Sequence, residues 1–131
     1  MRQINTIIIH AADTPADMDI GTAEIDRWHK GRGWSGIGYH YVIRRDGTLE
    51  RGRDESERGA HAYGHNADSI GVCMVGGRPG CNYTSAQWAC LESLVNDLVA
   101  RYDANVIGHN DVSGKPCPMF DAKAWAQTLD R

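Results

Sequence analysis

Apolar residues follow two kinds of pattern along this 131-residue chain. Ile4 to His10 includes three consecutive β-branched residues, Ile7 to Ile9, and such a nearly continuous apolar run predicts a central strand buried on both faces. From Trp88 to Tyr102, apolar residues recur at spacings of three and four, which predicts an amphipathic helix. Thr84 and Gln87 precede it as a capping box, so the helix start is also predicted.

Shorter apolar runs predict the other strands. Two of them should form a hairpin around the turn Asp46-Gly47, with strands at Tyr39–Arg44 and Thr48–Arg51. Two more are expected at Ser69–Val75 and Val106–His109. The segment between the hairpin and the next strand, Arg53 to Asn66, is too long for a simple connection and is expected to be functional or mobile.

Two further helices complete the pattern. Thr22 should cap a helix that runs to about Lys30, with Ile25, Trp28 and His29 as its inward residues. Asp121 should cap a last helix that ends near Leu129 and turns Trp125 inward. The predicted order, β–α–β–β–β–α–β–α, indicates an α/β (α+β) fold: a single domain over residues 1–131, with a central mixed sheet flanked by helices.

Composition narrows the class of protein. Hydrophobic residues make up 41% and charged residues 24% of the chain, which is typical of a soluble globular protein. The net charge of −3 gives no reason to expect nucleic-acid binding. No apolar run approaches the roughly 20 residues needed to cross a bilayer. Met1 to Asn5 does not begin a secretory signal, so synthesis in the cytoplasm is expected, with release by another route.

Four cysteines have different expected roles. Cys73 lies in a strand-like run and is expected to be a small buried apolar residue. Cys81 and Cys90 flank a helix start and could pair in an oxidising space, although a chain without a signal begins reduced. Cys117 lies in the segment His109–Cys117, which no strand or helix explains, and Pro116 and Pro118 restrict the backbone on both sides of it.

Two histidines and this cysteine form a candidate metal site. His10 and His109 each end a predicted strand, and with Cys117 they would supply three ligands and leave a fourth position open, as in catalytic zinc sites. The alternative is two satisfied histidines and a buried cysteine. Spacing alone leaves both interpretations open, because the two histidines are far apart in the chain and form no local motif.

Seven segments, in order along nearly the whole chain, carry a resemblance to a known family: Ile7–His10, Arg27–Lys30, Gly38–Tyr41, Arg45–Thr48, Gly52–Glu55, Asn66–Gly77 and Gly114–Asp121. Together they resemble the zinc-dependent N-acetylmuramoyl-L-alanine amidases of the type 2 class. The motif match is closest to the bacteriophage T7 lysozyme type, and peptidoglycan-recognition proteins are more distant relatives.

The resemblance implies roles for individual residues. His10, His109 and Cys117 fall on the family's ligands for a single Zn²⁺ ion, and Tyr39 and Lys115 fall on its catalytic tyrosine and lysine. In recycling amidases of this superfamily the third ligand is an aspartate and the base a glutamate, so Cys117 and Tyr39 place the chain with the phage and recognition-protein branch. His61 is expected to contact substrate, whereas His29, His40 and His65 are expected to be structural or exposed.

The implied reaction is hydrolysis of the amide bond between the lactyl group of N-acetylmuramic acid and L-alanine in peptidoglycan. The first hypothesis is a phage endolysin, monomeric, which reaches peptidoglycan in the periplasm at lysis. The alternatives are a module that binds muramyl peptides without cutting them and a cytoplasmic amidase that recycles wall fragments. Contact with a phage RNA polymerase is conceivable from the resemblance alone, and no membrane or nucleic-acid partner is expected.

Overall fold

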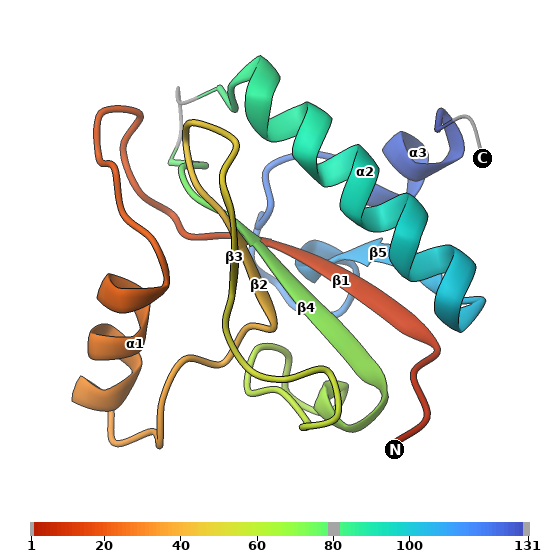
Figure 1. Ribbon diagram of the computed structural model, residues 1–131, viewed down its shortest axis with the longest axis horizontal. Coiled ribbons are helices and arrows are strands. Elements are labelled where there is room, and N and C mark those ends of the chain that lie inside the picture. The colour runs from red at the N-terminus through yellow and green to blue at the C-terminus, as the bar shows by residue number, and fades with distance from the viewer. Residues whose placement is uncertain (1, 79–81, 130–131) are drawn as a thin grey trace.

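The computed structural model describes residues 2–78 and 82–129, with a five-stranded mixed sheet at its centre (Figure 1). The strands are β1 (Thr6–Ala11), β2 (Tyr41–Ile43), β3 (Leu49–Arg51), β4 (Ser69–Met74) and β5 (Asn105–Gly108). The helices are α1 (Thr22–Gly31), α2 (Ser85–Tyr102) and α3 (Ala122–Gln127), with short 3-10 turns at η1 (Asn66–Asp68) and η2 (His109–Asp111).

The strands lie in the order β3-β2-β4-β1-β5. β1 pairs in parallel with β4 and β5, β2 pairs in parallel with β4, and only β3 runs antiparallel to its neighbour. The expected α/β fold with a central mixed sheet and the expected order of elements are therefore confirmed. The central strand β1 is buried along nearly its whole length, as its apolar run predicts.

Helix α2 covers one face of the sheet (Figure 1). Leu91, Val95 and Leu98 are fully buried there, and each such side chain contributes about 1.5–3 kcal/mol of hydrophobic free energy. The predicted capping box is confirmed: the Gln87 N–H donates to Thr84 Oγ1 (3.1 Å) and the Thr84 N–H donates to Gln87 Oε1 (3.0 Å). The start of α2 is thus fixed by its own side chains.

Helix α1 lies away from α2, beside the opposite face of the sheet (Figure 1). Ile25 and His29, one turn apart, are its buried residues. The prediction that Trp28 points inward is wrong, because its side chain is 42% exposed. Only one narrow side of α1 faces the sheet. Ile25 and His29, at positions i and i+4, lie on that side, whereas Trp28 lies outside it.

The caps of the two shorter helices differ in origin. The N-cap of α1 is Gly21, one residue before the predicted Thr22. The Thr22 N–H donates a hydrogen bond to Glu50 Oε1 in strand β3, at 2.8 Å. Asp121 caps α3 as predicted, accepting from the Ala124 N–H at 3.2 Å, and Trp125 packs half-buried against the core.

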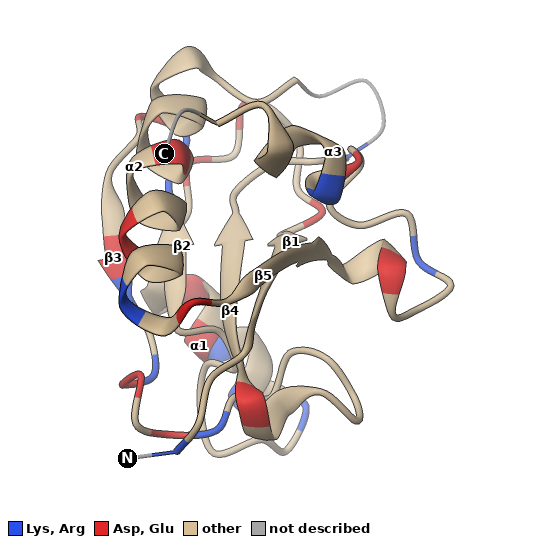
Figure 2. Cartoon of the chain, turned by 90° about the vertical axis from the view of Figure 1, so that its right-hand side faces the viewer, with Lys and Arg blue, Asp and Glu red and all other residues tan. Residues whose placement is uncertain are grey.

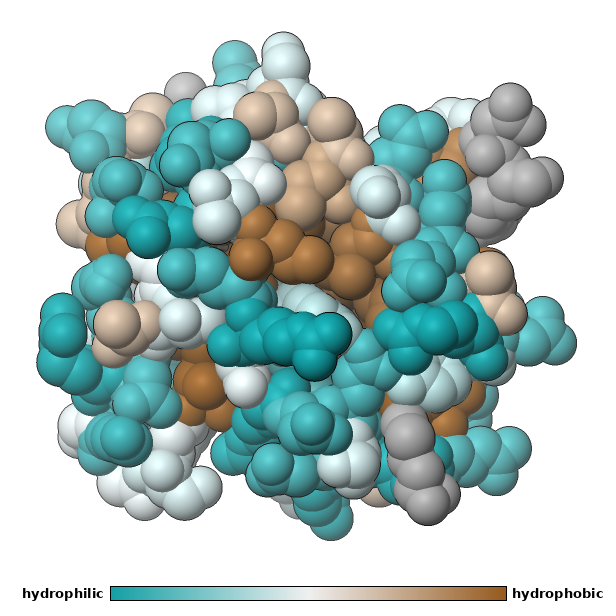
Figure 3. Space-filling model, in the orientation of Figure 1, coloured by the Kyte–Doolittle hydropathy of each residue, from teal (hydrophilic) through white to brown (hydrophobic). Residues whose placement is uncertain are grey.

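The surface shows no field of a single charge. Figure 2 shows acidic and basic residues interspersed along α2 and the loops, which agrees with the small net charge. In Figure 3 apolar side chains gather at the centre of the face that carries α2, and hydrophilic residues surround them. Among the described residues no helix is both long and apolar enough to cross a membrane. The suggested Cys81–Cys90 pair is not tested, because Cys81 lies outside the described residues.

Two buried histidines take the place of backbone acceptors. His40 Nδ1 accepts from the Gly71 N–H at 3.0 Å, and His29 Nδ1 accepts from the Gly38 N–H at 2.9 Å. Both rings are buried, and burial lowers the pKa of each below the ordinary value of 6.5. The expectation that these histidines are structural is confirmed. Each must stay neutral, because a protonated Nδ1 cannot accept a hydrogen bond.

This arrangement predicts acid sensitivity of the metal-free protein. Between the lowered folded pKa and about 6.5, the unfolded chain binds more protons than the folded one, so stability falls as pH falls. Each histidine contributes at most about 1.4 kcal/mol per pH unit. Urea unfolding with a chelator present should give a lower free energy at pH 5.5 than at pH 7.5.

His40→Asn is the matched variant, because Asn Oδ1 occupies the position of Nδ1 and accepts without titrating. The loss of stability between pH 7.5 and pH 5.5 should be smaller in His40→Asn than in the wild type. An unchanged pH dependence would contradict the role assigned to His40.

Candidate metal centre

Three of the predicted site residues converge on the sheet face opposite α2. One donor atom from each of His10, His109 and Cys117 can be chosen so that all three atoms lie within 4.8 Å of one another. His10 is almost fully buried, and the other two side chains are half-buried. Within residues 2–78 and 82–129, no second group of three such side chains comes together in this way.

Strand pairing explains the meeting of the two histidines. β1 and β5 run side by side in parallel, with Ile9 opposite Gly108, so the residues that follow each of these positions are neighbours at one end of the sheet. His10 and His109 are those residues, and their ring centroids lie 4.5 Å apart. The pairing of β1 with β5 therefore brings these two histidines together although they are far apart in sequence.

Cys117 reaches the histidines through a loop held by two hydrogen bonds. The Asn110 N–H donates to the Cys117 carbonyl at 2.7 Å, which closes the loop after η2. The Ala11 N–H donates to Cys117 Sγ at 2.9 Å, which fixes the sulfur beside the end of β1. An N–H aimed at sulfur stabilises a thiolate, the form in which cysteine binds metals.

The electrostatics of the metal-free cluster favour neutral imidazoles. Burial lowers the pKa of His10 well below 6.5, and neighbouring positive groups, among them Lys115, lower it further. Burial and then Lys115 likewise lower the pKa of His109. Burial raises the pKa of Cys117, whereas the Ala11 N–H and Lys115 act in the opposite direction. Both histidines thus keep a lone pair available for a cation near neutral pH.

Tyr39 and Lys115 lie beside this cluster. The Tyr39 ring centroid is 5.1 Å from that of His10. Burial, with a contribution from the sulfurs of Cys73 and Cys117, raises the pKa of Tyr39 well above 10. Lys115 is exposed, and its charge acts on all three members of the cluster.

His61 lies against the cluster from a different side. Its Nδ1 is 2.8 Å from His10 Nε2, and its Nε2 is 3.2 Å from Ser69 Oγ. The predicted contact with substrate remains a prediction, since both ring nitrogens already have partners inside the protein. His65, by contrast, is exposed, which agrees with the expectation that it is structural or exposed.

Three residues of strand β4 that were not predicted to belong to the site form the floor of this cluster. Ser69, Gly71 and Cys73 alternate along the strand, and Cys73 is in register with His10, so all three face the cluster. A side chain at Gly71 would collide with His61, since a Cβ there would lie 2.6 Å from His61 Cγ. The strand itself was predicted from the sequence. Because every second residue of a strand faces the same side of the sheet, the spacing of Ser69, Gly71 and Cys73 could have identified them.

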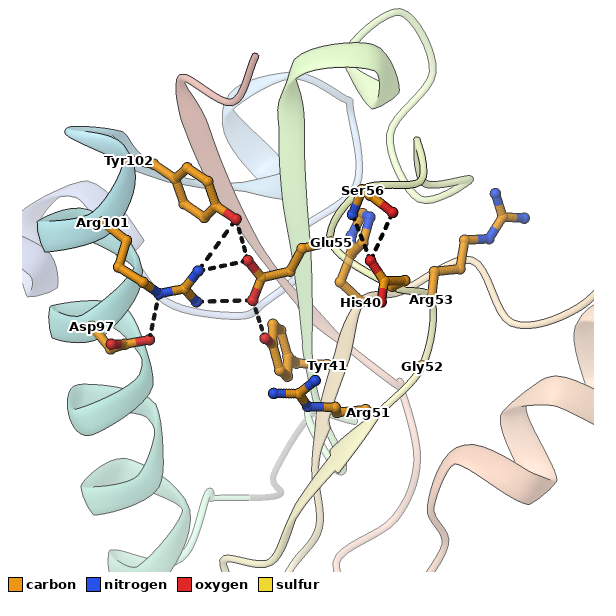
Figure 4. Close-up of a pocket in the computed structure, with 11 residues that line it drawn as sticks. His40, Tyr41, Arg51, Gly52, Arg53, Glu55, Ser56, Asp97, Arg101 and Tyr102 are labelled. Atoms are coloured by element: carbon orange, nitrogen blue, oxygen red, sulfur yellow. Dashed lines mark hydrogen bonds and ion pairs between the residues drawn. The ribbon is translucent and has the colours of Figure 1, made fainter. Parts of the chain in front are cut away.

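A second polar pocket lies on the α2 side of the sheet and is a weaker candidate site. Figure 4 shows Tyr41, Arg101 and Tyr102 pointing at Glu55 from β2 and α2. Arg101 holds both carboxylate oxygens, at 2.8 and 2.9 Å, and both tyrosine hydroxyls donate to the same group. Arg101 is the main reason that the pKa of Glu55 falls to about 2. This carboxylate serves structure, because all its acceptor positions are engaged.

Comparison with known proteins agrees with the geometry. The family model described as N-acetylmuramoyl-L-alanine amidase matches residues 1–120. The endolysin of Klebsiella phage KP32 is 45% identical over 130 residues, covering 95% of this chain and 86% of that protein. The endolysin of Escherichia phage T7 is 45% identical over 127 residues, covering 92% and 84%.

Solved structures have the same fold. The N-acetylmuramoyl-L-alanine amidase LysC from Clostridium intestinale URNW superposes with a TM-score of 0.83 at 37% identity, covering 89% of this chain and 77% of that one. Drosophila PGRP-LB, at 24% identity and a TM-score of 0.83, shares the fold over 98% of this chain and 82% of its own. The chain therefore belongs to the N-acetylmuramoyl-L-alanine amidase family. The family resemblance predicted from the sequence is confirmed, and with it the enzyme class, a phage-type peptidoglycan amidase.

The close approach at Gly71 predicts a specific sensitivity. Gly71→Ala should push His61 away from His10 and lower the affinity for Zn²⁺, used here as the test cation, by about tenfold or more. Overpacking should also lower the free energy of unfolding by about 1–3 kcal/mol. Affinity is measured by competition with a chromogenic chelator, and stability by urea unfolding.

Gly114→Ala is the control, since a Cβ at Gly114 meets nothing within 4 Å although this glycine adjoins Lys115. It should match the wild type in both assays. Wild-type Zn²⁺ affinity in Gly71→Ala would show that the packing of His61 is irrelevant to metal binding.

Proposed function

We propose that this protein is a zinc-dependent amidase that cleaves the bond between the lactyl group of N-acetylmuramic acid and L-alanine, and that it acts as an endolysin on host peptidoglycan. The convergence of His10, His109 and Cys117 carries the proposal. Family membership gives the reaction class, and the metal cluster gives it a chemical centre.

The donor set suits zinc. Two imidazoles and one thiolate are borderline and soft ligands, and three protein ligands with a fourth position left open are typical of catalytic zinc. His10, His109 and Cys117 would hold the ion, because one donor atom from each lies within 4.8 Å of the other two. When bound, zinc supplies a Lewis acid that activates water and polarises the scissile carbonyl.

Lys115 and Tyr39 are proposed to act on the two ends of the reacting amide. The Lys115 ammonium is exposed at the rim of the cluster, where it can stabilise negative charge that develops on the carbonyl oxygen. Tyr39, with its raised pKa, keeps its proton in the metal-free site and is poorly suited to be a base there. We assign it the task of orienting water and relaying a proton toward the amine that leaves.

The reaction can be tested directly on purified peptidoglycan. New L-alanine amino groups should appear, should vanish with a chelator and should return with zinc. New reducing sugar ends would mean a glycosidase and would overturn the proposed bond. Comparing intact sacculi with soluble wall fragments separates an endolysin from a recycling amidase, which would prefer fragments. Binding of zinc and sacculi without any cleavage would favour a binding module.

Substitutions separate the ligands from the other site residues. Cys117→Ala should lose zinc and activity together, because the thiolate is one of only three protein ligands. Tyr39→Phe and Lys115→Ala should keep zinc but lower turnover by about 10²–10⁴-fold. Zinc content by elemental analysis and turnover on sacculi are the two measurements. Full zinc occupancy in Cys117→Ala, or normal turnover in either other variant, would remove that residue from its role.

A further inference from the structure

A chain of three hydrogen bonds connects the candidate metal ligand His10 to the backbone. His10 Nε2 lies 2.8 Å from His61 Nδ1, and His61 Nε2 lies 3.2 Å from Ser69 Oγ. Ser69 Oγ in turn lies 2.6 Å from the His65 carbonyl oxygen. Neither the sequence motifs nor the metal cluster explains why a buried hydroxyl and a second imidazole stand behind His10.

The direction of each hydrogen bond in this chain follows from its final acceptor, the carbonyl oxygen of His65. A carbonyl oxygen only accepts, so the Ser69 hydroxyl donates to His65. Its hydrogen is then committed, and Ser69 can only accept from His61, so the hydrogen of His61 is on Nε2. That leaves a lone pair on His61 Nδ1, so the hydrogen between His61 and His10 belongs to His10 Nε2.

We propose that Ser69 and His61 form a relay that fixes His10 in the Nε2–H tautomer and leaves its Nδ1 lone pair for the zinc ion. His61 is in this view a positioning residue that acts through His10. The inference deepens the proposed function and rests on it, since it assigns the ligand atom of one of the three zinc ligands. A neutral imidazole offers a lone pair on only one nitrogen, so a wrong tautomer would block binding.

The structure around the relay restricts the ring of His61. Asn66 Oδ1 accepts from the N–H of His61 at 2.8 Å and from the N–H of Ala62 at 3.0 Å, which holds the loop in place. A Cβ at Gly59 would lie 2.4 Å from His61 Cδ2, so the loop backbone passes directly over the ring. A Cβ at Gly71 would likewise lie 2.6 Å from His61 Cγ, so the ring is packed closely between Gly59 and Gly71.

The relay also explains why His61 is not itself one of the ligands. Its Nδ1 accepts from His10 and its Nε2 carries a hydrogen, so no lone pair of His61 is free for a cation. Partners of this kind behind a ligating histidine fix ring orientation and raise ligand basicity, and their loss usually costs 10–100-fold in metal affinity.

The tautomers can be observed without any substitution. In metal-free protein labelled with ¹⁵N-histidine, long-range ¹H–¹⁵N couplings identify the protonated nitrogen of each neutral ring. The hydrogen is expected on Nε2 in both His10 and His61. A hydrogen on Nδ1 of either ring would overturn the relay.

Adding zinc then tests the ligand atom. The Nδ1 resonance of His10 should shift while its Nε2–H is retained, and a shift at Nε2 with loss of that hydrogen would overturn the assignment. No change at any histidine on adding zinc would instead defeat the proposed metal site, whereas the tautomer measurement would stand, so the two failures are distinguishable.

Two variants of nearly equal shape test the function of the acceptor. His61→Asn keeps an acceptor where Nδ1 stands, and His61→Leu has a similar shape without one. Zinc affinity should fall about 10–100-fold in His61→Leu and only a few-fold in His61→Asn. Equal affinities in the two variants, whether both high or both low, would overturn the role of the acceptor. Circular dichroism of the metal-free variants controls for folding.

Discussion

Parallel pairing of β1 with its two neighbours is the constraint on which the rest of the site depends. Parallel strands present their carboxyl ends at the same edge, so β1 and β5 bring His10 and His109 together although the chain between them contains most of the protein. The third candidate ligand is then brought to β1 by a single backbone donor, the N–H of Ala11. A shift of one residue in this pairing would turn His10 to the other face.

The two faces of the sheet have different compositions, because one packs against α2 and the other carries the candidate metal ligands. The face under α2 is apolar, with Ile7, Ile9 and Val72 packed against the helix. The other face has a smaller apolar cluster that includes Ile25 and Val42, and beside it lie buried imidazoles. These imidazoles are hydrogen-bonded, as buried polar groups must be to avoid a large energetic cost. Gly71 shows the connection between packing and chemistry, since its missing side chain makes room for a ring behind His10.

The sequence predicted what local rules govern and missed what depends on tertiary contacts. A nearly continuous apolar run identified β1, apolar periodicity identified α2, and the capping box identified the start of α2. Trp28 was misplaced, because helical spacing does not say how wide the inward stripe is. The grouping of His10, His109 and Cys117 was an open question from spacing and became a prediction through family motifs. Ser69 was missed, because a serine within a strand looks like an ordinary strand residue until its partner is known.

The arrangement suggests how such a small domain could hold a catalytic ion. Its candidate ligands come from a strand, the end of another strand and a loop, so ordering them at the moment of binding would cost conformational entropy. Contacts within the protein supply part of that order: the Ala11 N–H holds the Cys117 sulfur, and the Ser69–His61 relay holds the His10 ring. A site preorganised in this way loses little entropy when the ion binds, which favours tight and geometrically defined coordination. The polar face of the sheet then serves a purpose beyond its own hydrogen bonds, since its floor residues help to hold the ligand set in one conformation.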